Sequence, residues 1–103
     1  MSGDAVWFVY MVRSADGRLY TGVTTDTERR LNEHRQAGSK PKTRGAKYFR
    51  GRTGLHMVFK KSVANRSTAQ KLEYMIKQLE KPHKEALVQG AVSLEQLFPD
   101  EDE

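Results

Sequence analysis

Apolar and polar positions along the chain predict three strands. Residues 6–13 are apolar at almost every position, a pattern typical of a strand that is covered on both faces. Residues 18–24 and 55–61 carry shorter runs and predict two more strands. Residues 14–17 end in a glycine and separate the first two runs, so we expect them to form the turn of a β-hairpin.

A first helix is predicted directly after the hairpin. Thr25 followed by Glu28 has the pattern of a capping box, in which each side chain bonds the backbone N–H of the other residue. We expect this helix to extend to about Gln36, with Gly38 ending it.

Two further helices are predicted in the last third of the chain. Ser67 followed by Gln70 repeats the capping pattern and opens a helix to about residue 80, with an apolar stripe along one side. Pro82 suits the first turn of a shorter helix over residues 82–88. Residues 93–98 are expected to add one more turn.

The order β-β-α-β-α-α predicts an α/β (α+β) fold with a small three-stranded, mainly antiparallel sheet flanked by helices. With 103 residues, the chain is expected to form one domain over residues 1–99. The apolar fraction is 37%, and no apolar run approaches the ~20 residues of a membrane span, so no membrane association is expected. The absence of cysteine excludes disulfides and thiolate metal sites and fits a cytoplasmic protein.

Basic side chains strongly outnumber acidic ones once the C-terminus is set apart. The whole chain carries a net charge of +5, but residues 100–103 are all acidic and are expected to form a disordered tail. Residues 1–99 hold 18 basic and 9 acidic side chains, a net charge of +9. Nucleic acid is the natural partner for such a surface, although cationic surfaces also occur on proteins that bind none.

Residues 40–52 concentrate this charge, with six basic residues, no acidic residue and two aromatic ones. Basic and aromatic side chains together suit phosphate contacts and base stacking. The alternative is a solvated loop whose aromatic residues fill the core. The candidate nucleic-acid-binding side chains of this segment are Lys40, Lys42, Arg44, Lys47, Tyr48, Arg50 and Arg52.

The register of the hairpin decides whether Tyr10 and Tyr20 share a face of the sheet. A three-residue loop with Gly17 as a left-handed bulge residue sets Tyr10 opposite Gly22 and makes the two tyrosines diagonal neighbours. A two-residue turn would shift the pairing by one and place them on opposite faces. We favour the first register, in which Gly22 would leave open space above Tyr10 for the backbone of a nucleic acid.

Arg30 and His34 lie four residues apart on the first predicted helix, so they share one side of it. A guanidinium can hold a phosphate with two hydrogen bonds, and a histidine one turn away can support it or bond a tyrosine hydroxyl. The alternative is a surface arginine beside a half-buried histidine with a structural role.

Glu73 sits at the edge of the apolar stripe of its predicted helix, where a carboxylate needs a cationic partner or a metal ion. One carboxylate is enough for Mg²⁺, which keeps most of its water ligands. A salt bridge to an arginine or lysine is the simpler alternative, and Glu80 occupies a similar edge and competes for the role.

The tripeptides Phe8-Val9-Tyr10 and Tyr20-Thr21-Gly22, followed by Arg30 and Glu73, make the sequence resemble the GIY-YIG nuclease family over residues 6 to about 80. It is most similar to the small stand-alone bacterial branch often called YhbQ-like. The resemblance implies that the two tyrosines line the site, that Arg30 grips the scissile phosphate with His34 nearby, and that Glu73 holds one divalent ion, Mg²⁺ or Mn²⁺.

The sequence departs from the family pattern at several positions. The usual tripeptides are Gly-Ile-Tyr and Tyr-Ile-Gly, and here Phe8, Val9 and Thr21 stand at positions that mostly pack. An amide side chain that some members place after the glutamate has no counterpart in residues 84–86. Val23 stands where some members carry a lysine.

The chemistry expected of these residues is hydrolysis of phosphodiester bonds, in DNA rather than RNA, with flapped or branched structures as candidate substrates. We expect Arg30 and a metal ion to lower the pKa of a nearby tyrosine, which makes Tyr10 the first choice as general base or proton relay, with Tyr20 orienting water. A non-catalytic nucleic-acid-binding domain and an accessory module that meets an acidic protein are the alternatives. The oligomeric state stays open.

Overall fold

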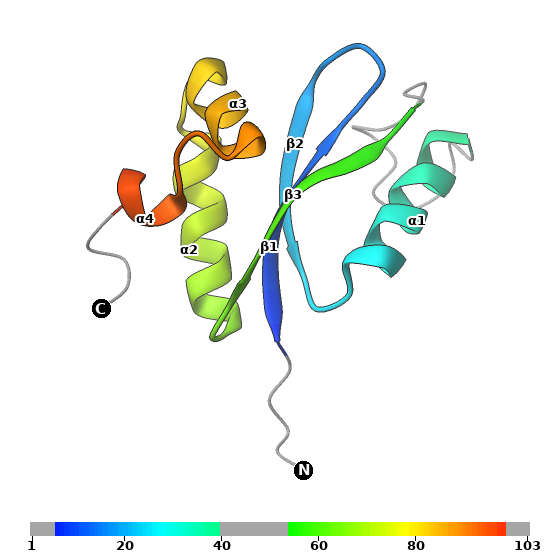
Figure 1. The fold of residues 1–103 in the computed structure, drawn as a ribbon. Coiled ribbons are helices and arrows are strands. Elements are labelled where there is room, and N and C mark those ends of the chain that lie inside the picture. The colour runs from blue at the N-terminus through cyan, green and yellow to red at the C-terminus, as the bar shows by residue number, and fades with distance from the viewer. Residues whose placement is uncertain (1–5, 40–53, 99–103) are drawn as a thin grey trace.

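A three-stranded antiparallel sheet lies at the centre of the computed structural model, which describes residues 6–39 and 54–98 (Figure 1). The elements are β1 (Trp7–Arg13), β2 (Leu19–Thr24), α1 (Thr27–Ser39), β3 (His56–Val63), α2 (Arg66–Lys77), α3 (Lys81–Gln89) and α4 (Leu94–Leu97). The strand order is β2-β1-β3, and both pairings are antiparallel. The predicted α+β class and element order are confirmed, and α4 is the extra turn expected within residues 93–98.

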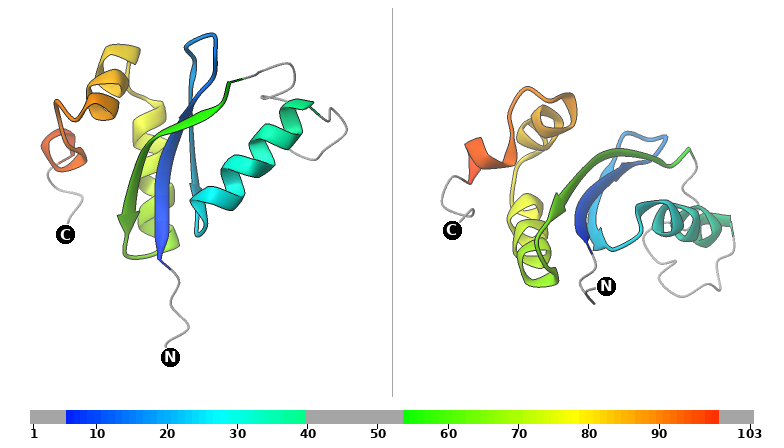
Figure 2. Two further views of the ribbon diagram at one scale, coloured as in Figure 1. Left: turned by 45° about the vertical axis from the view of Figure 1, so that its right-hand side comes forward. Right: turned by 60° about the horizontal axis from the view of Figure 1, so that its bottom comes forward.

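Helices cover both faces of the sheet, with α1 on one side and α2, α3 and α4 on the other (Figure 2). The central strand β1 accordingly buries its side chains in both directions. Val9 and Met11 pack into the core formed with α2, α3 and α4, whereas Tyr10 and Val12 pack with Leu31 of α1. The nearly continuous apolar run at residues 6–13 therefore does mark a strand between two layers.

The hairpin between β1 and β2 has the predicted register. Tyr10 pairs with Gly22 and Val12 pairs with Tyr20. The backbone N–H of Ser14 donates to the carbonyl of Arg18 at 3.0 Å, which closes the three-residue loop. Gly17 has a φ of +87°, the left-handed conformation that a bulge at this position requires.

The first helix begins and ends later than its sequence pattern suggests. The backbone N–H of Arg29 donates to the side chain of Asp26 at 3.0 Å, so Asp26 caps α1 and the predicted cap at Thr25 is wrong. The helix also continues through Gly38 to Ser39. A single glycine weakens a helix by only about 1 kcal/mol relative to alanine, which is too little to end this one.

The second helix is capped by Asn65, and the predicted cap at Ser67 is also wrong. The side chain of Asn65 accepts the N–H of Thr68 at 2.8 Å. The prediction at Pro82 is confirmed, since this residue lies in the first turn of α3. At the start of α4, Ser93 forms a capping box with Gln96, which was not predicted from the sequence.

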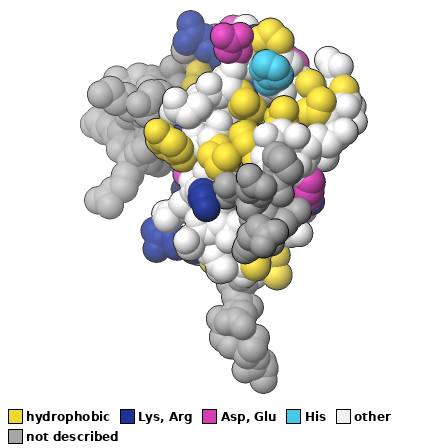
Figure 3. Space-filling model, turned by 90° about the vertical axis from the view of Figure 1, so that its left-hand side faces the viewer, with side chains coloured by type: hydrophobic (Ala, Val, Ile, Leu, Met, Phe, Trp, Pro, Cys, Tyr) yellow, Lys and Arg dark blue, Asp and Glu magenta, His cyan; other side chains and the backbone are white. Residues whose placement is uncertain are grey.

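The helices on the second face are tied to the sheet by apolar packing and by ion pairs. Figure 3 views this side and shows hydrophobic side chains reaching the surface between charged ones. Arg13 at the end of β1 donates two hydrogen bonds, of 2.7 and 2.6 Å, to the carboxylate of Glu85 in α3. This pair fixes α3 against the strand that carries Tyr10.

The basic segment at residues 40–52 and the acidic residues 100–103 lie outside the described residues. Within the described ranges, no helix combines the length and the apolar character needed to cross a bilayer.

Candidate active site

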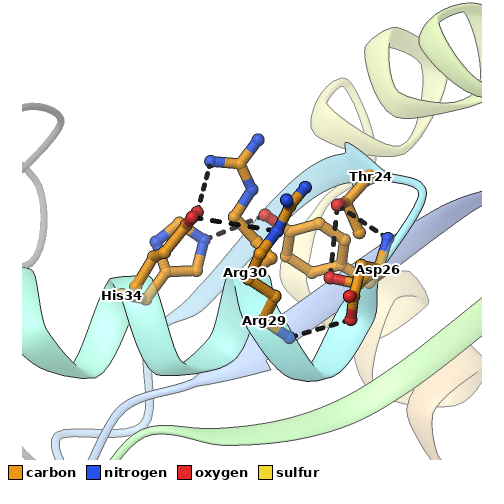
Figure 4. Close-up of polar contacts among 7 residues, drawn as sticks. Thr24, Asp26, Arg29, Arg30 and His34 are labelled. Atoms are coloured by element: carbon orange, nitrogen blue, oxygen red, sulfur yellow. Dashed lines mark hydrogen bonds and ion pairs between the residues drawn. The ribbon is translucent and has the colours of Figure 1, made fainter.

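The hydroxyl of Tyr10 lies on the α1 side of the sheet and is hydrogen-bonded to Nε2 of His34 at 2.9 Å. Tyr10 is only 4% exposed because β1 is the central strand and Leu31 of α1 packs over it. His34 projects from α1 toward this phenol (Figure 4). The predicted hydrogen bond between the histidine and a tyrosine is therefore present.

Gly22 on β2 allows this arrangement. A Cβ atom at Gly22 would lie 2.7 Å from Cζ of Tyr10 and closer still to its hydroxyl oxygen. The expected open space for a nucleic acid backbone above Tyr10 is therefore wrong, because the phenol itself fills it. Gly22 shapes the site by admitting the tyrosine ring over the neighbouring strand.

Burial, more than charge, sets the protonation of Tyr10 and His34. Burial raises the pKa of Tyr10 to about 12, with Arg30 opposing the rise and Glu73 and Glu33 adding to it. Burial, and secondly Arg30, lowers the pKa of His34 to about 4. The expected lowering of the tyrosine pKa by Arg30 is present at Tyr10, but burial outweighs it. Both groups are neutral at neutral pH.

Arg30 lies one helical turn before His34 on α1 (Figure 4). Its side chain is 42% exposed and makes a 3.3 Å salt bridge with Glu33 on the same helix. An exposed pair of this kind contributes little to stability, so an incoming phosphate can replace Glu33. The charge of Arg30 lowers the pKa of both Tyr10 and His34. Figure 4 shows the side chain of Arg30 beside His34 on α1.

Glu73 approaches the same place from α2. Its carboxylate is 23% exposed and forms a 3.1 Å salt bridge with Lys77, one turn later on the helix. Its negative charge is one of those that raise the pKa of Tyr10. The competing candidate Glu80 is instead the exposed N-cap residue of α3. Of these two candidates, Glu73 on α2 is therefore the one whose charge raises the pKa of Tyr10.

A cavity of about 370 Å³ opens beside Tyr10 and His34. Its lining includes Tyr10, Tyr20, His34, Lys77 and Lys84. The two lysines are site residues that the sequence did not single out. The available signals were the spacing of Lys77 from Glu73 and the position of Lys84 in the stretch where the family resemblance expects an amide.

The donor set suits a hydrated cation. Among the described residues, no three histidine, aspartate or glutamate side chains gather into a metal site. Glu73 does not line this cavity, but its half-buried carboxylate is paired with Lys77, which does. A single carboxylate with an exchangeable lysine partner fits an ion such as Mg²⁺ that keeps most of its waters and takes further oxygens from phosphate.

The structure brings together Tyr10, Tyr20, Arg30, His34 and Glu73 from four separate elements. The other candidates for nucleic acid binding, apart from Gly22, lie outside the described residues. They are Lys40, Lys42, Arg44, Lys47, Tyr48, Arg50 and Arg52.

Known proteins share both the sequence and the fold of this site. Residues 6–86 match the family described as the GIY-YIG catalytic domain. The UPF0213 protein YhbQ of Escherichia coli O127:H6 is 50% identical over 92 residues, spanning 88% of this chain and 86% of that protein. A UPF0213 protein of Klebsiella pneumoniae is 48% identical over 92 residues, spanning 89% of this chain and 81% of its own. The solution NMR structure of the UPF0213 protein BH0048 from Bacillus halodurans is similar with a TM-score of 0.50 and 37% identity, covering 82% of this chain and 83% of that one.

Proposed function

The chain belongs to the GIY-YIG catalytic domain family, and on that premise we propose that it is a metal-dependent endonuclease that hydrolyses phosphodiester bonds in DNA. One observation carries the proposal. The phenol of Tyr10 and the imidazole of His34 are hydrogen-bonded at one cavity, and the charges of the Arg30 guanidinium and the Glu73 carboxylate act on that phenol. These are the groups that phosphodiester hydrolysis needs for proton transfer, charge neutralisation and metal binding.

Arg30 is proposed to neutralise the non-bridging oxygens of the scissile phosphate. Its planar guanidinium can give two parallel hydrogen bonds to a phosphate, and its exposure lets it turn from Glu33 to the bound strand. Charge builds on these oxygens as water attacks phosphorus, so a fixed cation stabilises the transition state more than the ground state.

Glu73 is proposed to hold one Mg²⁺ or Mn²⁺ ion after its salt bridge with Lys77 opens. When bound there, the ion would supply charge stabilisation for the departing 3′ oxygen. Lys77 lines the cavity, so the lysine released from Glu73 stays within it and can contact a phosphate.

Tyr10 and His34 are proposed to form the route by which the attacking water loses its proton. The neutral phenol accepts that proton on its oxygen while its own proton passes to Nε2 of His34, 2.9 Å away. The water oxygen bonds to phosphorus, and the bond from phosphorus to the 3′ oxygen breaks. The 3′ oxygen leaves with the electron pair of that bond and takes a proton from solvent to become the 3′-hydroxyl. A phosphate bound at Arg30 offsets the positive charge that lowers the pKa of His34, so binding makes the imidazole a better acceptor. Tyr20, in the same cavity, would orient the water.

Flapped or branched DNA is the proposed substrate. The cations that line the cavity suit contacts with phosphates, which fix position without reading bases. Recognition of shape rather than sequence follows from such contacts. We also propose that the substrate is DNA rather than RNA.

The test incubates the protein with labelled single-stranded, flapped and branched DNA and RNA in Mg²⁺, Mn²⁺ or chelator. We expect metal-dependent cleavage that falls by at least about a hundredfold in Glu73→Ala and in Arg30→Ala, with most of the binding affinity retained in both. A protein that binds these substrates without forming products at any metal concentration would overturn the proposal.

A non-catalytic nucleic-acid-binding domain is the second candidate. It is favoured by the salt bridge between Glu73 and Lys77, because this pair gives the carboxylate a cationic partner in place of a metal ion. The same substrate panel separates it from the endonuclease.

A further inference from the structure

A second cavity of about 360 Å³ adjoins the candidate active site at the hairpin end of β2. It is lined by Arg18, Leu19, Tyr20, Lys81 and Lys84. Leu19, Tyr20 and Lys84 also line the active-site cavity, so the two hollows lie side by side. We refer to the second hollow, from Arg18 to Lys84, as the β2-edge groove.

We propose that the β2-edge groove binds the phosphodiester backbone of a single strand that leaves the active site toward the hairpin turn. This inference rests on the proposed function, because it assigns a path to the same substrate.

The charge of the groove fits phosphate. Arg18, Lys81 and Lys84 supply three cations, and Lys77 adds a fourth in the adjoining cavity. No carboxylate is among the described residues that line either hollow. The nearby acids Asp16 and Glu73 are each in a salt bridge, with Arg18 at 3.5 Å and with Lys77 at 3.1 Å. Four lining cations and no lining carboxylate suit a polyanion better than a small anion.

The fold places these cations along one line. Gly22 pairs with Tyr10 at the active site, and Arg18 lies four residues earlier, just before β2 begins. At about 3.4 Å per residue, this separation is roughly 13 Å. Lys81 is held at the hairpin end, because its Nζ donates to the carbonyl of Gly17 at 2.9 Å. Lys84 follows on α3 and reaches both hollows.

Tyr20 supplies an aromatic surface in the middle of this line. It is half-buried and contributes to the lining of both hollows. A cationic groove with an aromatic platform is typical of sites for single strands, because each base can stack and each phosphate can pair with a cation. A duplex hides its bases and gains nothing from the tyrosine, so we commit to a single strand.

The test measures binding of a short fluorescein-labelled single strand, as DNA and as RNA, by anisotropy in chelator across a salt series. Lys84→Glu is expected to weaken binding by about tenfold and to lower the slope of log affinity against log salt by about 0.7 per lost phosphate contact. Lys81→Glu should act in the same direction. Lys71→Glu is the matched control, since Lys71 is an exposed lysine of α2 that lines neither hollow, and its effect should stay within about twofold.

Thermal unfolding of each variant checks the fold, and Lys84→Gln replaces Lys84→Glu if the latter unfolds. Equal losses in Lys84→Glu and Lys71→Glu, or a wild-type protein that binds no single strand, would overturn the proposal. If Lys84→Glu cleaves flapped DNA at the wild-type rate, the nuclease proposal stands and the β2-edge groove has no role in binding the substrate. If the wild-type protein cleaves none of the substrates but Lys84→Glu selectively loses single-strand binding, the groove stands and the nuclease proposal fails.

Discussion

Tyr10, Gly22 and His34 form one packing unit, and it sets the chemistry of the candidate site. The glycine admits the phenol over β2, and the histidine bonds its hydroxyl at 2.9 Å. The same burial keeps both groups neutral. The sequence could predict that the two tyrosines share a face, because register is a local property of the hairpin. It could not predict that the phenol fills the space above Gly22, since this depends on α1 packing over β1.

Gly22→Ala is expected to destabilise the fold by about 1–3 kcal/mol, because the new methyl group would meet the buried ring of Tyr10. Chemical denaturation measures the change. In a Tyr10→Phe background the same substitution should cost less, because the hydroxyl oxygen nearest to the methyl group is gone. Equal costs in the two backgrounds would contradict the contact.

His34 is expected to make the stability depend on pH. Its pKa is about 4 in the folded protein against 6.5 for the free side chain, so between these values the unfolded chain binds the proton more readily. The free energy of unfolding should therefore fall as the pH decreases through this window and level off below it. Urea denaturation across the window should show a smaller decline in His34→Gln. An identical decline in both proteins would assign the effect to other groups.

At the scale of elements, helices were predictable and their first residues were not. Three polar residues in succession, Thr24, Thr25 and Asp26, can each cap α1. Asp26 is selected because its own N–H donates to the hydroxyl of Thr24 at 3.1 Å, a contact that depends on where β2 ends. Asn65 outcompetes Ser67 at α2 in the same way, since β3 runs to Val63 and leaves Asn65 at the turn into the helix.

The pair between Arg13 and Glu85 is expected to stabilise the docking of α3 on the sheet. A double-mutant cycle to alanine should give a coupling free energy of about 1 kcal/mol, because the pair is bidentate and its side chains are only 31% and 24% exposed. The pair of Lys61 with Glu95 is the matched control, with exposures of 42% and 45%, and its coupling should be smaller. Equal coupling free energies in the two cycles would contradict a special contribution of the Arg13–Glu85 pair to the docking of α3.

At the scale of the whole molecule, the site forms where elements on both faces of the sheet reach the edge strand β2. The hairpin and α1 supply Tyr10, Tyr20, Arg30 and His34, and these were predictable because helical spacing and hairpin register are local. Lys77 and Lys84 were not, because their place in the cavity depends on how α2 and α3 pack across the sheet. The net charge of +9 over residues 1–99 indicated a polyanion, but only the fold shows which of the described cations line the cavity.

The most direct test of the nuclease assignment compares single-turnover cleavage of flapped DNA by Glu73→Gln and Glu80→Gln across a range of Mg²⁺ concentrations. We expect a rate at least about a hundredfold below wild type for Glu73→Gln and a near wild-type rate for Glu80→Gln, because the charge of Glu73 acts on Tyr10 whereas Glu80 is an exposed residue at the start of α3. Equal rates for the two variants, at any concentration of the metal, would contradict the assignment.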